Sequence, residues 1–319
     1  MNCSLRRFRY NAEKAQSAYN RRLIDSRTGI MFTQEELRYI DQIILPLVAK
    51  GQSIHHIYVT HKRQMICSEK TLYNLIDKGV LRTRNVDLIS KVKRKRPKHR
   101  QQHKVDRRCH VGRTLQDFHN FKELHPGIIP VEMDCIEGVL EDQTVLLTLY
   151  WPHLQFLVVR VMAAQTAFEV QRQFQLLLNE LGPELFQLLF PVILTDRGSE
   201  FSDPVSIEKL TGTSIFYCDP GRADQKPCVE NANGLVRRLV PKGFSIQALT
   251  IEDGFTISSH LNAYTRLSLN NKSAYELVLS LYGQTVLDAL HIDQIAPEDV
   301  VLTPTALSPR LVRKTYGQQ

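Results

Sequence analysis

The sequence predicts two parts of different fold class, an all-α part in front and an α/β sheet domain behind it. The charge is segregated: residues 1–125 hold 27 Lys and Arg against 11 Asp and Glu, a net +16. Residues 126–319 hold the remaining 14 Lys and Arg against 22 Asp and Glu, a net −8. Capped amphipathic helices are indicated in the front part, whereas three apolar strands open the second part. Strands that then alternate with helices are typical of a sheet with helices packed on it.

The composition excludes membrane and disulfide-rich classes. The chain has 319 residues, 43% of them hydrophobic, which is enough for two cores. No apolar run approaches the roughly 20 residues that span a bilayer, and the basic start lacks a following apolar stretch. The six cysteines are scattered without a Cys-x-x-Cys pair, as in proteins with reduced thiols. We therefore expect a cytoplasmic protein with no signal peptide and no membrane association.

Three short helices are predicted in the front part. Thr33 and Glu36 match a capping box, and apolar residues follow at helical spacing. Pro46 is expected to kink or interrupt this first helix. Ser53 and Ser68 are placed to cap the second and third helices.

The third helix, "EKTLYNLIDK", has the pattern of a DNA-reading helix. Its apolar residues are expected to face inward, and its polar ones lie on the opposite face. Three such helices indicate a helix-turn-helix unit within residues 1–90, although a generic small helical bundle fits the pattern equally well. The DNA-contacting residues expected on this helix are Lys70, Tyr73 and Asn74.

A strongly basic run, "KVKRKRPKHR", follows at residues 91–100 with seven Lys or Arg and no acid. Such a run is either a solvated linker or, beside a DNA reader, a segment that lies along phosphates. We assign residues 91–125 to a basic linker. The DNA contacts predicted in it are Lys91, Lys93, Arg94, Lys95 and Arg96.

From residue 128 the hydrophobic pattern changes to one that is typical of β-strands. "IIPVEMDCIEG", "TVLLTLYW" and "HLQFLVVRVM" are predicted strands, rich in Val, Leu and aromatic residues. "TAFEVQRQFQLLLNELG" is an amphipathic helix with a Thr166–Glu169 capping box, and "PELFQLLF" is a short second one. A strand "PVILTD", a strand "SIFYCDPG" and a helix from about Pro227 complete the pattern.

Three carboxylates stand out in this domain. Asp134 lies inside the first strand, Asp196 ends the fourth, and Glu230 lies one turn into the last helix. The turn "DRG" after Asp196 also fits ordinary Asp-x-Gly turn chemistry. A carboxylate in a core strand is costly unless it is paired or bound to a metal. Oxygen ligands suit Mg²⁺, and two such ions can stabilise the attacking and leaving oxygens of a displacement at phosphorus.

The chain resembles the DDE transposases of the IS-thirty type of bacterial insertion sequence. The resemblance runs through "SEKTLYNLIDKG", "VEMDCIEG", "VILTDRGSEF", "FYCDP", "LVPKG" and "LNNKSAYELV", and so covers nearly the whole chain. Between the three carboxylates lie 61 and then 33 residues, and the second spacing is the family's own. The resemblance implies a retroviral-integrase-like core of ribonuclease-H fold over residues 126–283, before a C-terminal tail at 284–319. It implies catalytic and metal-binding roles for Asp134, Asp196 and Glu230.

The activity implied is DNA transposition. The family binds the terminal inverted repeats of its element, cuts the DNA at the element end, and transfers the freed 3′-hydroxyl to target DNA, all by phosphoryl transfer. The cofactor implied is Mg²⁺, with Mn²⁺ as the alternative ion. The expected partners are double-stranded DNA, both element ends and target, and further copies of the chain, at the bacterial nucleoid. Two alternatives stay open: a catalytically decayed DNA-binding repressor of the element, and a ribonuclease-H-type nuclease.

Three positions depart from the family pattern. Arg197 follows the second aspartate where the family usually has Asn, and Asp224 and Pro227 replace the Trp and Gly of Trp-Gln-x-Gly. Pro227 is compatible with the first turn of a helix. Because Arg197 is a permanent cation beside a metal ligand, we expect it to be inhibitory or neutral for metal binding, rather than a DNA phosphate contact.

Further charged residues surround these motifs. Lys226, Arg237, Arg238 and Lys242 flank the Glu230 helix, and for this group DNA-backbone contact is expected at least as much as ordinary surface charge, with Arg237 and Lys242 as the named contacts. Two other acids are assigned bland roles, Glu132 as an exposed edge residue and Glu200 as a local hydrogen-bond partner. His55, His61 and Cys67 lack a fourth ligand at suitable spacing, so we do not predict a zinc site.

Overall fold

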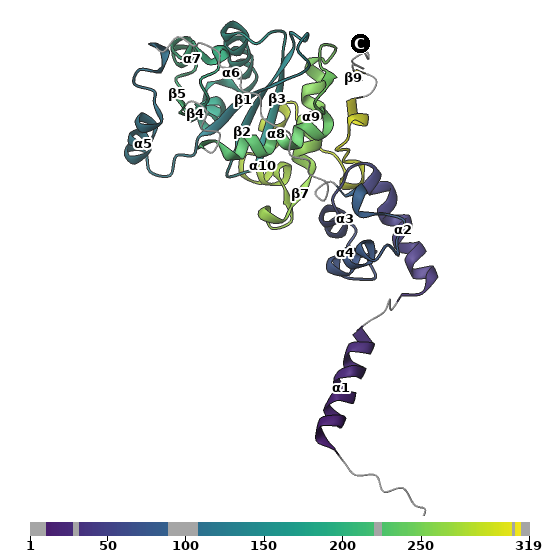
Figure 1. Ribbon diagram of the computed structural model, residues 1–319. Coiled ribbons are helices and arrows are strands. Elements are labelled where there is room, and N and C mark those ends of the chain that lie inside the picture. The colour runs from purple at the N-terminus through teal and green to yellow at the C-terminus, as the bar shows by residue number, and fades with distance from the viewer. Residues whose placement is uncertain (1–10, 28–31, 89–107, 220–224, 308–309, 314–319) are drawn as a thin grey trace, which may run out of the picture.

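The computed structural model describes residues 11–27, 32–88, 108–219, 225–307 and 310–313. It has an all-helical front part and a sheet-based second part, as the sequence predicts (Figure 1). The basic run at 91–100 and Asp224 lie outside the described residues. In the part of the chain that is described, no helix is long and apolar enough to cross a membrane.

The front part contains four helices within its described residues, and three of them begin at the predicted caps. Thr33 and Glu36 form the capping box, and the side chains of Ser53 and Ser68 each accept a backbone N–H of the next turn. The helices are α1 (Ala12–Arg27), α2 (Gln34–Ala49), α3 (Ile54–Thr60) and α4 (Glu69–Asp77).

Helix α2 runs through Pro46, so of the predicted kink or interruption the interruption is wrong. Proline removes one backbone N–H, and here the buried face of the helix outweighs that loss. This face belongs to a separate core that α2, α3 and α4 share. Its buried side chains include Leu37, Ile40, Ile44, Ile54, Ile57, Leu72, Leu75 and Ile76.

The second part is built on a five-stranded sheet in the order β3-β2-β1-β4-β5. The strands are β1 (Val131–Glu137), β2 (Val145–Trp151), β3 (Phe156–Met162), β4 (Val192–Thr195) and β5 (Ser214–Tyr217). The first three pair antiparallel, while β4 is parallel to β1 and β5 is parallel to β4. This strand order, with helices on both faces, is the ribonuclease-H-like arrangement that the resemblance implies.

Helices cover both faces of the sheet. Along β1, Val131 and Met133 join the core under α6 (Ala167–Leu189), α10 (Ala274–Tyr282) and α11 (Gln284–Ala289). Ile136 joins the opposite core, under α8 (Pro227–Leu239) and α9 (Ile251–Ala263). Because alternate residues of a strand face opposite sides, Glu132 and Asp134 lie on the α8 side. Helix α5 (Leu115–Leu124) packs on β4 and β5, and α7 (Pro204–Thr211) follows β4.

Helix α6 is broken at Gly182, whose φ of 73° is left-handed, so the predicted pair of helices is confirmed. The expected tail at 284–319 contributes to both cores, through Val286 and Leu287 on one side and Val300 and Leu302 on the other. Val286 and Leu287 lie in the six-residue helix α11, which is too short to give a clear periodic signal.

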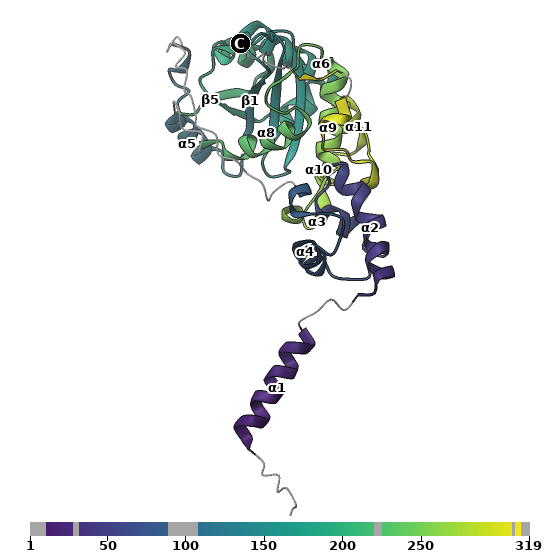
Figure 2. The same cartoon turned by 45° about the vertical axis from the view of Figure 1, so that its right-hand side comes forward.

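The helical front part docks on the second part through the start of α3 (Figures 1 and 2). Gln52 donates its amide to the carbonyls of Pro297 (2.9 Å) and Val300 (3.0 Å). The backbone N–H of Leu302 donates to the carbonyl of Lys50 at 2.8 Å. At Gly51 (φ +80°) a Cβ atom would lie 2.8 Å from the Leu302 carbonyl oxygen, so this close approach requires glycine.

Candidate functional site

Asp134 and Asp196 converge on the α8 side of the sheet. In the parallel β1–β4 pair, Glu132 stands opposite Leu194. Two residues further along, and on the same face, Asp134 and Asp196 follow in the same direction. Asp196 Oδ1 accepts the backbone N–H of Gly198 at 3.1 Å, which is the hydrogen bond expected of an Asp-x-Gly turn. The two carboxylates therefore meet where β4 ends.

One ammonium group bridges the two carboxylates. Lys226 Nζ lies 3.1 Å from Asp134 Oδ1 and 3.3 Å from Asp196 Oδ2, and it also donates to the Met133 carbonyl at 3.2 Å. Only 4% of the Lys226 side chain is exposed. The sequence pattern predicts that Lys226, like the other cations around the Glu230 helix, lies on the surface and can contact DNA. The structure corrects this, because the side chain points inward to the carboxylate pair.

Helix α8 brings further polar groups to the same place. Asn233 Nδ2 donates to Asp134 Oδ2 at 2.8 Å, so the two Asp134 oxygens each have a partner from α8 or its N-cap. Residues 226, 230 and 233 are separated by four and then three positions, a spacing that keeps side chains on neighbouring turns close together. Glu230 therefore lies within about one turn of both Lys226 and Asn233, and its side chain is exposed.

Glu132 anchors the start of α8, contrary to its expected exposed position. Only 5% of the residue is exposed, and its carboxylate accepts the backbone N–H of Val229 at 2.7 Å. The first N–H groups of a helix have no partner within the helix, and a carboxylate at that end also suits the helix dipole. This partner is formed by tertiary structure, so local sequence could not reveal it.

The charges in the site shift the pKa values in a consistent way. Burial raises the pKa of Asp134, with the Lys226 charge opposing that rise. For Lys226, burial acts to lower the pKa, but the Asp134 and Asp196 charges outweigh it and raise the pKa. The lysine is therefore an ammonium ion in this site. Burial also raises the pKa of Glu132 and of Glu200.

Arg197 points to the end of β5. Its Nε donates to the Cys218 carbonyl at 3.1 Å, and its Nη2 lies 3.7 Å from Asp219 Oδ1. Arg197 is therefore paired with groups at the end of β5 and not with the carboxylate pair, and its expected inhibitory or neutral role in metal binding stays a prediction. Glu200 accepts the Gln165 amide at 3.0 Å, as a local hydrogen-bond partner would.

Over the residues that the structure describes, no three His, Cys, Asp or Glu side chains come together closely enough to hold a metal ion. At the carboxylate pair the third group is Lys226. The histidine-rich stretch is used differently, since His55 Nδ1 lies 3.1 Å from Glu69 Oε2 and His56 is buried in the docking contact.

The predicted DNA-contact residues fall into three groups. Lys70, Asn74 and Lys242 are exposed. Tyr73 is half-buried against the α2–α4 core rather than on the open face, and Arg237 donates to the Glu137 carbonyl at 2.8 Å. Lys91, Lys93, Arg94, Lys95 and Arg96 lie outside the described residues.

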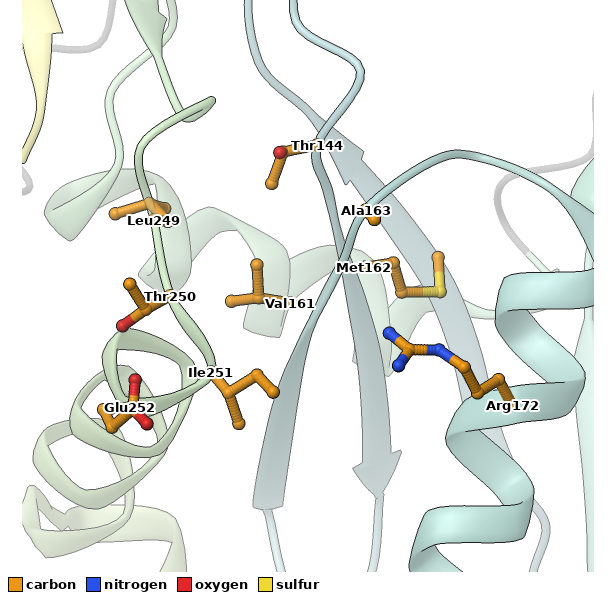
Figure 3. A pocket seen from close by; sticks show the side chains of 9 residues that line it. All are labelled: Thr144, Val161, Met162, Ala163, Arg172, Leu249, Thr250, Ile251 and Glu252. Carbon is orange, nitrogen blue, oxygen red and sulfur yellow. The ribbon is translucent and has the colours of Figure 1, made fainter.

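A separate shallow pocket of about 370 Å³ opens between β3, α6 and the start of α9 (Figure 3). Its wall is mostly apolar, with Arg172 pointing in from α6 and Glu252 from α9. None of the predicted carboxylates lines it. The carboxylate pair on β1 and β4 is therefore the stronger candidate site.

The strand order and directions define the fold as a ribonuclease-H-like core. Asp134 and Asp196 lie at adjoining strands of this core, and Glu230 lies on α8. No protein-family model matches the chain. The transposase for insertion sequence element IS1086 of Cupriavidus metallidurans is 26% identical over 281 residues, 84% of this chain and 80% of that protein. Transposase InsI for insertion sequence element IS30A of Escherichia coli is 30% identical over 83 residues, 26% of this chain and 22% of that protein. These relatives are transposases of insertion sequences, an IS30 element among them, which confirms the resemblance.

Solved structures of integrase cores also resemble the second part. The catalytic core domain of BIV integrase aligns at 18% identity with a TM-score of 0.36, covering 48% of this chain and 95% of that one. The catalytic core domain of HTLV-2 integrase, in complex with magnesium in a trimeric form, aligns at 16% identity and a TM-score of 0.34. It covers 47% of this chain and 97% of that one. The fold assignment itself depends on the strand order and directions given above.

Proposed function

We propose that the chain is a DNA transposase that binds the terminal inverted repeats of an insertion sequence and catalyses metal-dependent strand cleavage and strand transfer. Homology to transposases over 84% of the chain supports a DNA-processing enzyme. The observation that carries the catalytic part is the shared cation position between Asp134 and Asp196, with Glu230 on the adjoining helix α8.

The donor set fits a hard divalent cation. Two carboxylates from adjoining strands already converge on one cationic nitrogen, and carboxylate oxygens are the ligands that Mg²⁺ and Mn²⁺ prefer. We propose Asp134 and Asp196 as its first ligands and Glu230 as the third, which must close on the ion because these three described carboxylates are not gathered without it. When bound, it would supply charge stabilisation to the phosphoryl oxygens of the scissile bond.

The other residues of the site position these ligands. Asn233 orients Asp134 through its Oδ2, and Glu132 fixes the N-terminus of α8, the helix that carries Glu230. Both contacts tie α8 to β1. In this proposal they keep the glutamate at a constant height above the two aspartates.

DNA binding is assigned to the basic front part. Lys70 and Asn74 are exposed on α4, and the +16 charge of residues 1–125 would neutralise phosphates. Lys242 and Arg237, near the end of α8, would contact the backbone of the strand being cut. We further propose that the chain acts as a homo-oligomer, because transposition joins two element ends to one target.

The test is a cleavage assay on the DNA that flanks the chain's own gene, with and without Mg²⁺. Asp134→Asn, Asp196→Asn and Glu230→Gln each remove an anionic ligand while keeping side-chain shape. Each should lower cleavage by more than about a hundredfold, since changes at residues that merely orient a metal ligand already cost that much. DNA affinity should stay near wild type, whereas Asp134→Asn and Asp196→Asn should lower the Tm, because each leaves the buried Lys226 ammonium with one carboxylate fewer.

The outcomes separate the alternatives. Nicks at defined ends that need Mg²⁺ and all three carboxylates support the transposase. Wild-type cutting by any one variant removes that residue from the site. End binding without cleavage would favour the decayed repressor, and cutting of RNA–DNA hybrids in preference to duplex ends would favour the nuclease. The homologues favour neither of these alternatives.

A further inference from the structure

We propose that Lys226 is a built-in competitor for the divalent metal: its ammonium occupies the cation position between Asp134 and Asp196, and metal loading requires it to swing out. This inference rests on the proposed function, because it concerns the same carboxylate pair. It adds a specific regulatory role for a residue that the transposase proposal does not use.

The competition follows from which oxygens are taken. Asn233 donates to Asp134 Oδ2, whereas Lys226 holds Oδ1 at 3.1 Å, so each oxygen of this carboxylate already has a partner. On the other strand Lys226 holds Asp196 Oδ2 at 3.3 Å. A metal ion that bridges the same two carboxylates would lie within a few ångströms of the ammonium, where two cations repel each other strongly in a partly buried site.

The burial pattern gives the two cations different routes. Lys226 is 4% exposed and reaches the pair from the protein side, while the Asp196 side chain is 48% exposed and Asp134 20%. A metal ion can therefore approach from solvent through Asp196. The lysine is on a flexible four-carbon stem at the N-cap of α8, so its head can leave without unwinding the helix.

The lysine also has a role while no metal is bound. Two carboxylates on neighbouring strands repel each other, and a shared ammonium removes that repulsion. Lys226 thus holds α8 against β1 and keeps the pair assembled. The cost is a weaker apparent metal affinity, since the ion must displace a cation that is already paired.

The experiment measures Mn²⁺ binding to the full chain by electron paramagnetic resonance of the free ion, in the absence of DNA. Lys226→Gln and Lys226→Met should each bind Mn²⁺ roughly tenfold more tightly, or better, since the competing charge is gone. Lys209→Gln, an exposed lysine on α7, makes the same change in net charge away from the site and should leave the affinity unchanged. Thermal unfolding of the same proteins gives a second reading: without metal the Lys226 variants should melt below wild type, and Mn²⁺ should raise their Tm more.

The arms distinguish the possible failures. If both Lys226 variants bind Mn²⁺ no more tightly than wild type while Asp134→Asn weakens binding, the metal site stands and the competition is wrong. If Lys209→Gln tightens binding as much as Lys226→Gln, the effect is net charge and the inference is again overturned. If Asp134→Asn binds as wild type does, the proposed metal site fails and takes the inference with it.

Discussion

Replacing Gln52 with alanine should loosen the helical front part from the catalytic core. Gln52 is 2% exposed, and its amide nitrogen donates to the carbonyls of Pro297 and Val300 at 2.9 and 3.0 Å. A third carbonyl, that of Glu298, lies at 3.4 Å. No other side chain in the described residues makes as many contacts to this C-terminal segment, so the amide is the natural place to cut the docking contact.

The expected cost can be worked from these contacts. Two good hydrogen bonds contribute about 1 kcal/mol each, and a buried carbonyl left without a donor costs about 1–3 kcal/mol more. Pro297 keeps a partner in His56 Nε2 at 3.1 Å, so the carbonyl of Val300 carries most of that penalty. The docking free energy should therefore fall by roughly 3–5 kcal/mol.

The assay uses the chain's one tryptophan. Trp151 lies in β2 and is 3% exposed, so its fluorescence reports the sheet domain, whereas far-ultraviolet circular dichroism reports all helices. In urea, wild type should show coincident transitions. In Gln52→Ala a first dichroism step should appear about 1 M or more below the fluorescence step, because urea slopes are about 1–3 kcal/mol per molar. Gln42→Ala, at an exposed position of α2, is the matched control.

A wild-type profile for Gln52→Ala would refute this reasoning. Coincident transitions at the wild-type midpoint would mean that the amide contributes nothing net, and that other contacts hold the two parts together. Separation of the transitions in Gln42→Ala as well would show that any change in α2 or the segment after it uncouples the parts.

Two further predictions concern His56 and Arg197. His56 Nδ1 accepts the N–H of Thr265 at 3.1 Å, and burial lowers the pKa of the ring, with His55 and His61 adding to that effect, while a bond to the Pro297 carbonyl opposes it. The unfolded chain therefore binds the proton first, and stability should fall as the pH drops below about 6.5. The free energy of unfolding of wild type minus that of His56→Gln, measured between about pH 7.5 and pH 5, should show this loss; a constant difference would contradict it. Arg197→Asn should cost about 1 kcal/mol through the lost Cys218 bond and leave Mn²⁺ affinity unchanged. Tighter Mn²⁺ binding would instead restore the inhibitory role first expected for Arg197.

The strands and the helix caps were predictable because their signals are local. Val-rich runs of seven residues and Ser or Thr three residues before a backbone donor need no knowledge of the rest of the fold. Helices α5 and α9 were not predicted. Helix α5 buries Phe118 fully and Leu115 and Phe121 only partly, so its apolar stripe is short and lies within the segment assigned to the basic linker. Helix α9 is buried through Ser258, Ser259 and Asn262, which read as surface residues.

Asn262 and Ser258 show why such burial is invisible in one sequence. Their side chains bond to the backbone of β3: Asn262 to both the N–H and the carbonyl of Leu157, and Ser258 to the N–H of Val159. Strand β3 is an edge of the sheet, and its free backbone groups take these side chains as partners. The polar side chains of α9 thus bond to backbone groups of the sheet edge, and this role depends on which strand lies beside the helix in the folded chain.

The same limit explains why the cation of the candidate site was placed wrongly. Arg197 is adjacent to Asp196 in sequence, and proximity along the chain made it the expected neighbour of the carboxylates. Lys226 is 30 positions further on, but the N-cap of α8 returns it to the end of β4, whereas Arg197 turns away to β5. Helix α8 also carries Arg238, whose guanidinium donates to the Gly51 carbonyl and lies 5.9 Å from the centre of the Tyr264 ring. One helix therefore touches the carboxylate pair at its start and the helical front part at its end.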